Sequence, residues 1–300
     1  MSDAPHIAPE HITSILDDAE AAVSASDFER ARELAADSLA QIAGVKHDAQ
    51  AALELRARAL LGSALTRLLL ADEAVDAMLP ALQIHGDSGV EVLKIEVLLQ
   101  LGIACEQCQR VDDAFRYFES AADLASTHDL PRAEYRALDS LRLIYSRQSD
   151  MENAIRVGEA ALDAASRSSI DSSYLGALNN LGVTHYGFGN NARALELLQQ
   201  VVAAVDPEQN PNVGGTYINI AGVLTRMGHR DEAMTSLRKG IDICERGGVR
   251  HFAAFGRLSL GSQLIELGDY DEALETLQQT LPELIALGRH QEEADARGHI

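Results

Sequence analysis

The sequence of 300 residues contains no Trp, and aromatic residues make up only 4% of it. Pro is also scarce, with 7 residues, whereas apolar residues make up 46%. Strands favour aromatic and β-branched residues, so this composition argues against a protein built from sheets. A core of Ala and Leu with few prolines is typical of closely packed helices. We therefore expect an all-α fold without strands.

The sequence also has few basic residues, and its apolar runs are short. The net charge of −21 disfavours binding to nucleic acid or to an anionic membrane. The longest apolar stretch, 57–71, is interrupted by Arg58 and Arg67 and falls short of the roughly 18 residues that span a bilayer. The opening residues MSDAPHIAPEHITS carry neither the basic nor the apolar segment of a signal peptide. These features predict a cytoplasmic protein, and the abundance of Ala, Arg and Asp suggests a bacterial one.

Recognisable catalytic and metal-binding motifs are missing. Cys105, Cys108 and Cys244 are too few for a disulfide framework. The first two form a C-x-x-C without a second pair of ligands, so partly buried thiols are a better interpretation than a metal site. The GFGNN run at 187–191 lacks the preceding strand and the following Lys of a phosphate loop. We expect no enzyme activity, no metal and no cofactor.

An internal repeat of about 40 residues runs through the sequence. Its landmark is a position occupied in six of seven copies by Gly or Ala, with spacings of 43, 40, 40, 40, 39 and 40; the seven are Ala19, Gly62, Gly102, Arg142, Gly182, Ala221 and Gly261. An Ala lies twelve residues after every one of them. Each copy reads as two amphipathic helices joined by a short turn. The expected units are 8–44, 47–85, 88–127, 129–167, 171–206, 211–247 and 249–288, within one array over 1–300.

The small landmark residues predict where the two helices of a unit cross most closely. Arg142 breaks this rule, so we expect its side chain to bend outward or its helix pair to be more open. Pro80 and Pro282 fall inside second helices and should kink or interrupt them. Residues 289–300 read as the start of a further repeat or as a capping helix. We favour the start of a further repeat, and hence a longer natural protein.

The landmark, the constant Ala and turns such as GDYDEA at 268–273 resemble the tetratricopeptide repeat. The resemblance implies a right-handed α-solenoid of about seven antiparallel helix pairs, whose first helices line a concave groove. The period departs from the usual length of about 34 residues. Longer repeats of this kind are similar to those of kinesin light chain and of bacterial regulators of the MalT and Rap type.

Polar residues recur two positions before the landmark, where the resemblance places side chains that face the groove. They are Gln100, Ser140, Asn180, Asn219 and Ser259. Asn is unfavourable inside a helix. In the resembling adaptors asparagines here hold the backbone of an extended peptide, because an amide both donates and accepts hydrogen bonds. The alternative is that these residues are tolerated on a solvated inner face. For Asn179, one position earlier, a local role and a groove role both stay open.

Arginines recur five positions after the landmark, at Arg67, Arg147 and Arg226. They either pair with carboxylates of a ligand or pair with Glu and Asp of the protein itself. Val183 and Tyr186 would add apolar contact with a ligand, or would serve helix packing instead.

These residues predict a module that binds a peptide or protein segment in its groove. The alternative is the N-terminal sensory region of a longer bacterial signalling protein, with an output domain such as a diguanylate cyclase or a transcription activator. The two differ in whether the natural gene encodes an output domain beyond Ile300.

Overall fold

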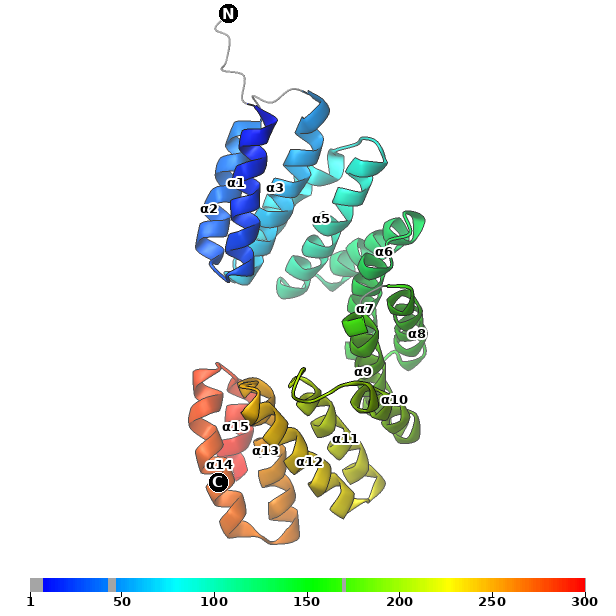
Figure 1. Ribbon diagram of the computed structural model, residues 1–300, viewed down its shortest axis with the longest axis vertical. Coiled ribbons are helices and arrows are strands. Elements are labelled where there is room, and N and C mark those ends of the chain that lie inside the picture. Colours follow the sequence, from blue (N-terminus) through cyan, green and yellow to red (C-terminus); the bar gives the residue numbers. More distant parts are fainter. Residues whose placement is uncertain (1–7, 43–46, 169–170, 300) are drawn as a thin grey trace, which may run out of the picture. The chain divides into compact units, whose positions relative to one another are not determined.

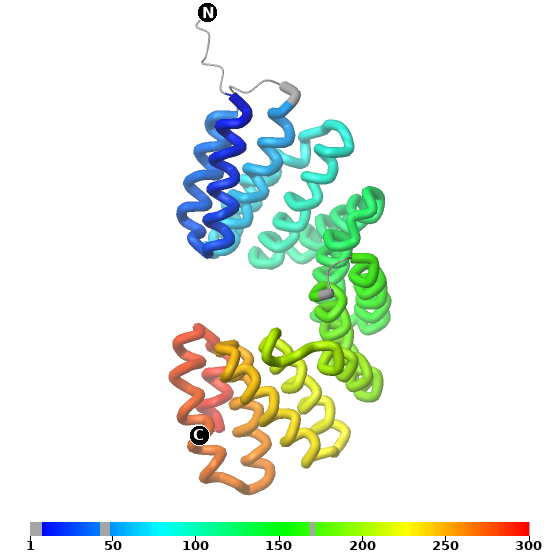
Figure 2. Tube along the Cα trace, viewed as in Figure 1, coloured from blue at the N-terminus to red at the C-terminus, as the bar shows by residue number. Residues whose placement is uncertain are grey.

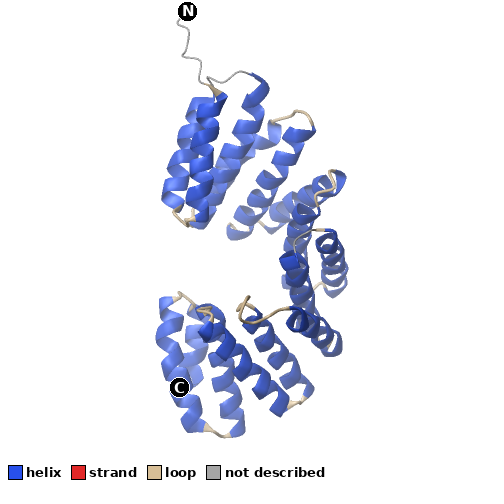
Figure 3. Cartoon of the chain, in the orientation of Figure 1, coloured by secondary structure: helices blue, strands red, loops and turns tan. Residues whose placement is uncertain are grey.

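The computed structural model describes residues 8–42, 47–168 and 171–299. Within these ranges all regular structure is helical and no strand occurs (Figure 3). The helices are α1 (Pro9–Ser24), α2 (Phe28–Ile42), α3 (His47–Arg67), α4 (Ala71–Met78), η1 (Leu79–Gln83, a 3₁₀ helix), α5 (Ser88–Gln107), α6 (Val111–Thr127), α7 (Pro131–Arg147), α8 (Met151–Arg167), α9 (Asp171–Gly187), α10 (Asn191–Ala204), α11 (Val213–Met227), α12 (Arg230–Arg246), α13 (Arg250–Leu267), α14 (Tyr270–Ala286) and α15 (His290–His299). The predicted all-α class is confirmed.

The chain forms two compact units, an N-terminal unit of residues 1–173 and a C-terminal unit of residues 174–300. In the N-terminal unit α1 packs on α2, α3 on α4, α5 on α6 and α7 on α8, and in the C-terminal unit α11 packs on α12 and α13 on α14 (Figure 1). First helices also contact the first helices of neighbouring pairs, as α3 does α5 and α11 does α13. Each unit therefore has a continuous layer of first helices, as in a tetratricopeptide solenoid.

Every first helix ends in the same turn. Seven residues after the landmark φ is positive at Ser26, Leu69, Gln109, Ser149, Gly189, Gly228 and Gly268. The next N–H donates to the carbonyl five residues earlier, as Leu70 does to Leu65 (2.9 Å), which is the Schellman arrangement. The Leu70 carbonyl then accepts from the N–H of the constant Ala74 (2.9 Å). One residue thus ends the first helix and begins the second. The connection between α10 and α11, which joins two helix pairs, is longer and runs over residues 205–212 (Figure 2).

The landmark glycines allow the close approach of the paired helices. A Cβ atom at Gly62 would overlap Met78, one at Gly102 would overlap the Phe118 ring, and one at Gly261 would overlap Leu277. In each case the overlapping side chain lies sixteen residues after the landmark. All seven constant Ala residues are buried, at 0–2% exposed, as at Ala74 and Ala273. The predicted steric role of the small residues is confirmed.

The prediction that Arg142 bends outward is wrong. Its side chain is buried, with the residue 8% exposed, and its Nε donates to Asp139 Oδ1 at 2.7 Å. Sixteen residues later the chain has Gly158, also buried, where five of the other six copies have a large side chain. In this repeat the large residue, Arg142, stands at the landmark, and the small one, Gly158, stands sixteen positions later. The carboxylate of Asp139 compensates the charge that this arrangement buries.

The two prolines differ in their effect. Pro80 lies in the first turn of η1, so the second helix of that pair breaks after Met78 as predicted. Pro282 lies inside α14, which continues to Ala286 without a break. The last helix, α15, packs on α13 and α14 through Ala296, its buried residue.

Candidate functional site

A cavity of about 400 Å³ opens on the first helices of the C-terminal unit. Its lining includes Tyr186 from α9, Asn219 and Arg226 from α11, and Phe255 and Ser259 from α13. We call it the inner-face cavity. Four of these five residues belong to the predicted groove set. The 40-residue register therefore brings residues that are distant in sequence together around one space.

An asparagine network borders this cavity. Asn179 Oδ1 accepts from Thr216 Oγ1 at 3.1 Å and from Asn219 Nδ2 at 3.4 Å. Asn179 Nδ2 donates to Asn180 Oδ1 at 3.4 Å. The interaction between Asn179 and Thr216 is the shortest of the three, and Thr216 is buried. Asn179 therefore has a local role, while Asn219 has its side chain at the edge of the cavity.

Arg226 and Tyr186 form the polar end of the inner-face cavity. The guanidinium lies over the Tyr186 ring, 3.9 Å from its centroid, and also donates to the Tyr186 carbonyl. Gly222 makes room for this ring, because a Cβ there would lie 3.1 Å from Tyr186 Oη. Stacking on an aromatic face leaves the edges of a guanidinium free to meet a carboxylate. The Arg226 side chain is thus held in place by Tyr186, with no ion pair to an acidic residue in the described part of the chain.

Phe255 was not predicted from the sequence. It is 43% exposed although it is a large aromatic residue, and it lies one helical turn before Ser259 on α13. The sequence could have indicated Phe255, because it lies four residues before Ser259 and therefore shares its helix face. Glu266, which is exposed on the same helix, supplies an acidic group at the cavity.

The remaining predicted residues do not line this cavity. Asn180 joins the network described above, and Val183 is 37% exposed on α9. The other four lie in the N-terminal unit with partners inside the protein. Gln100 donates to Glu96 (2.8 Å), Ser140 to the Arg136 carbonyl (3.2 Å) and Arg147 to Glu106 (2.6 Å), while Arg67 lies over the Phe28 ring (5.8 Å). A contact of any of these residues with a ligand stays a prediction.

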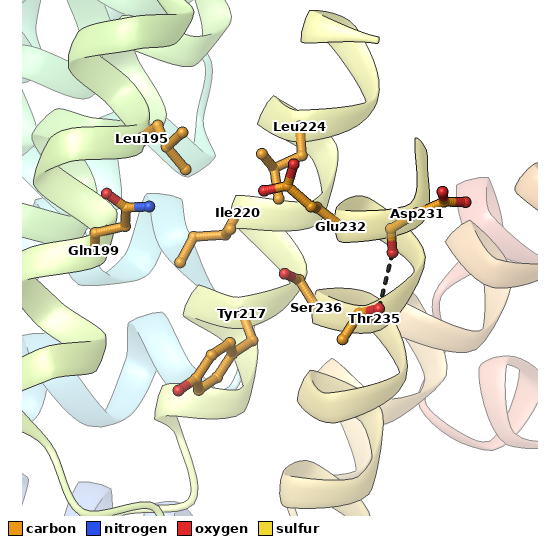
Figure 4. A pocket seen from close by; sticks show the side chains of 9 residues that line it. All are labelled: Leu195, Gln199, Tyr217, Ile220, Leu224, Asp231, Glu232, Thr235 and Ser236. Carbon is orange, nitrogen blue, oxygen red and sulfur yellow. Dashed lines mark hydrogen bonds between the residues drawn. The ribbon is translucent and has the colours of Figure 1, made fainter. Parts of the chain in front are cut away.

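The opposite face of α11 borders a second cavity, of about 430 Å³, in the C-terminal unit (Figure 4). Leu195 and Gln199 from α10 flank it on one side, and Asp231 and Thr235 from α12 on the other. Tyr217 at one end already holds a cation, since Lys239 Nζ lies 4.3 Å from its ring centroid. The acidic residues lie in the first turn of α12, where they complement the helix dipole. Their position therefore has a structural explanation that needs no ligand.

Each of the three free thiols is either buried or hydrogen-bonded within the protein. Burial raises the pKa of Cys105 and of Cys244 to about 11. Cys108 donates a hydrogen bond to Asp72 at 3.3 Å. In the part of the chain that the structure describes, no group of His, Cys, Asp and Glu is arranged to hold a metal ion. None of the described helices combines the length and apolarity that crossing a membrane requires.

Sequence and structural similarity agree on the class of protein. Residues 175–204 and 213–247 match the sequence profile of the tetratricopeptide repeat. No curated protein sequence matches the chain. These two segments therefore carry tetratricopeptide repeats, in agreement with the resemblance noted above.

Solved structures share the fold at low sequence identity. The apo form of RapI has a TM-score of 0.70 at 11% identity, over 92% of this chain and 77% of RapI. The apo quorum sensor NprR from B. thuringiensis has a TM-score of 0.67 at 14% identity, over 96% of this chain and 80% of NprR. The Rap conjugation gene regulator of plasmid pLS20, in complex with the Phr* peptide, has a TM-score of 0.56 at 14% identity, over 98% and 96%.

Proposed function

We propose that the inner-face cavity of the C-terminal unit binds an extended peptide or protein segment and does not catalyse a reaction. One observation carries the proposal. Around a space of about 400 Å³, α9 presents an aromatic ring, α11 an amide and a held guanidinium, and α13 a hydroxyl and a 43% exposed Phe. Peptide grooves in proteins combine apolar anchors with a few placed polar groups in this way.

The polar groups suit a peptide backbone. Asn219 uses one N–H toward Asn179, so its carbonyl oxygen remains to accept from a peptide N–H. Phe255 supplies an apolar surface for a ligand side chain, and Arg226 suits a ligand carboxylate. The pLS20 Rap regulator, which shares the fold, was solved with a bound peptide. The free buried thiols accord with action in a reducing cytoplasm.

The test begins with selection of peptides from a random displayed library on the full chain, followed by fluorescence polarisation of the enriched peptides. Each net hydrogen bond contributes roughly 0.5–1.5 kcal/mol, so Asn219→Ala with Ser259→Ala, which removes two polar groups that line the cavity, should weaken binding about five- to a hundred-fold. Asn210→Ala with Asn212→Ala is the matched control, because it also removes two polar side chains, which are exposed and lie outside the cavity. Enriched peptides whose affinity survives both the test pair and Phe255→Ala would show that binding lies elsewhere.

A second candidate is the sensory region of a longer bacterial signalling protein with an output domain. The observation that favours it is the likeness to the NprR quorum sensor and to the Rap gene regulator. The test is to sequence the transcript beyond Ile300 and to assay any encoded output domain with and without an enriched peptide. A stop codon at that point, or an output activity that ignores the peptide, would contradict this candidate.

A further inference from the structure

The N-terminal unit contains a cavity of about 580 Å³, larger than the inner-face cavity. It lies between α5 and α7, next to the end of α8. Val92 and Ile95 from α5, with Leu130 and Pro131 at the start of α7, give it an apolar wall. Its volume falls within the 300–1,000 Å³ that is usual for small-ligand sites.

Positive charge gathers at this cavity although the chain is strongly acidic. Three of the 25 basic residues, Arg132, Arg136 and Arg167, line it. Arg136 pairs with Glu96 through two hydrogen bonds, of 2.7 and 3.3 Å. Arg167 pairs with Glu134 at 2.8 Å. These two guanidinium groups are therefore already neutralised within the protein.

Glu96 stays ionised in this setting. Burial acts to raise its pKa, but the hydrogen bonds and charge of Arg136 outweigh it, and the pKa of Glu96 lies below its ordinary value. The ion pair with Arg136 therefore holds at neutral pH. Arg132 is different, because it is exposed and forms no hydrogen bond or ion pair with any residue in the described ranges. One guanidinium without a directly paired carboxylate thus borders the apolar wall, and its charge also acts on Glu96.

We infer that this cavity binds a monoanionic ligand with an apolar body. The carboxylate of the ligand pairs with Arg132, and the apolar part lies against Val92, Ile95 and Leu130. The positive end of the α7 dipole, which begins at Pro131, adds to the attraction. Two sources share this chemistry, a hydrophobic residue at the free C-terminus of a peptide and a free hydrophobic carboxylic acid. The inference does not depend on the inner-face cavity.

The test uses the full chain and saturation-transfer NMR with three probes: acetyl-Gly-Gly-Leu as the free acid, the same peptide as the C-terminal amide, and octanoate. A carboxylate probe should bind and the amide should not. Arg132→Gln should weaken binding of that probe about tenfold or more, as expected for loss of a charge-assisted hydrogen bond. Arg230→Gln is the matched control, because this exposed arginine also lies in the first turn of a helix, α12, and should change affinity by less than about twofold.

The outcomes separate the two sources and the two cavities. Tighter binding of the peptide acid identifies a C-terminus, and tighter binding of octanoate identifies a small acid. Phe255→Ala, in the other unit, should leave both affinities unchanged. The inference is overturned if neither carboxylate binds at millimolar concentration, if the amide binds as well as the acid, or if a correctly folded Arg132→Gln variant keeps full affinity.

Discussion

Asn179 and Asn180 are neighbours in α9, yet their side chains have different surroundings. Asn179 accepts from the buried Thr216 hydroxyl and from Asn219, so it connects α9 to α11. Side chains about one repeat apart in sequence lie on neighbouring first helices, so their polar groups can hydrogen-bond to each other. This explains why a residue that is unfavourable inside a helix is retained. Asn219 donates one long hydrogen bond to Asn179, and its residue also lines the inner-face cavity.

Asn179→Ala should destabilise the protein by about 1–2 kcal/mol, because the buried Thr216 hydroxyl loses its acceptor. Asn219→Ala should cost less than about 0.5 kcal/mol, because its single bond to Asn179 is weak at 3.4 Å. Urea denaturation of both variants measures the difference. Equal losses would show that Asn219 is as structural as Asn179, and would remove the argument that it is free to bind a peptide.

Single residues also mark the limit of prediction from the sequence. The repeat register predicted that Tyr186, Asn219, Arg226 and Ser259 share one face, and the inner-face cavity contains all four. The register could not predict that Arg226 stacks on Tyr186, because that contact depends on the distance between α9 and α11. The landmark alone predicted that the Arg142 side chain bends outward. Gly158, sixteen residues later, is small enough to let it be buried instead.

Helix pairs are held by a match of size between the landmark and the side chain sixteen residues later. Gly102→Leu should destabilise the N-terminal unit by about 1–3 kcal/mol, because the new side chain overlaps Phe118. Phe118→Ala alone should cost about 3–5 kcal/mol through the cavity it leaves. Together the two changes should cost clearly less than the sum of the single losses, which a double-mutant cycle measures. Strict additivity would show that the two positions are independent.

The turns between first and second helices differ between the two units. Positive φ falls on Leu69, Gln109 and Ser149 in the N-terminal unit, but on Gly228 and Gly268 in the C-terminal unit. A residue with a Cβ atom is strained in this conformation, whereas Gly is not. The helical period predicted where these turns lie. It could not reveal that non-glycine residues adopt the left-handed conformation there.

Leu69→Gly should therefore stabilise the protein by about 0.5–1 kcal/mol, after the extra entropy of Gly in the unfolded chain is subtracted. Leu69 suits the test because it is 82% exposed, so its truncation removes little packing. Gly228→Ala, at the equivalent turn, should destabilise by about 1 kcal/mol. Thermal unfolding of both variants checks the opposite signs. A stability loss in Leu69→Gly would show that its side chain has contacts that outweigh the strain.

At the scale of the whole molecule, repeat proteins are held together by neighbour contacts, so stability varies along the chain. In the C-terminal unit α15 buries one residue, Ala296, against α13 and α14, and α14 leaves Leu274 and Ile285 40% and 48% exposed. We expect amide hydrogen exchange within this unit to be fastest over 271–299 and slowest in α11 and α12. Mass spectrometry of exchanged fragments resolves these segments. Exchange over 271–299 as slow as in α11 would identify α15 as a firm cap.

The sixteen-residue size match has a consequence for how such a gene changes by recombination. Both partners, such as Gly102 with Phe118, lie inside one helix pair. Duplication or deletion of a whole repeat therefore transmits a matched pair. A crossover that falls within those sixteen codons of misaligned copies could instead join Arg142 to a partner as large as Phe118, or leave a glycine opposite Gly158. Surviving breakpoints in related genes should therefore concentrate between repeats, and a comparison of repeat phylogenies can detect this.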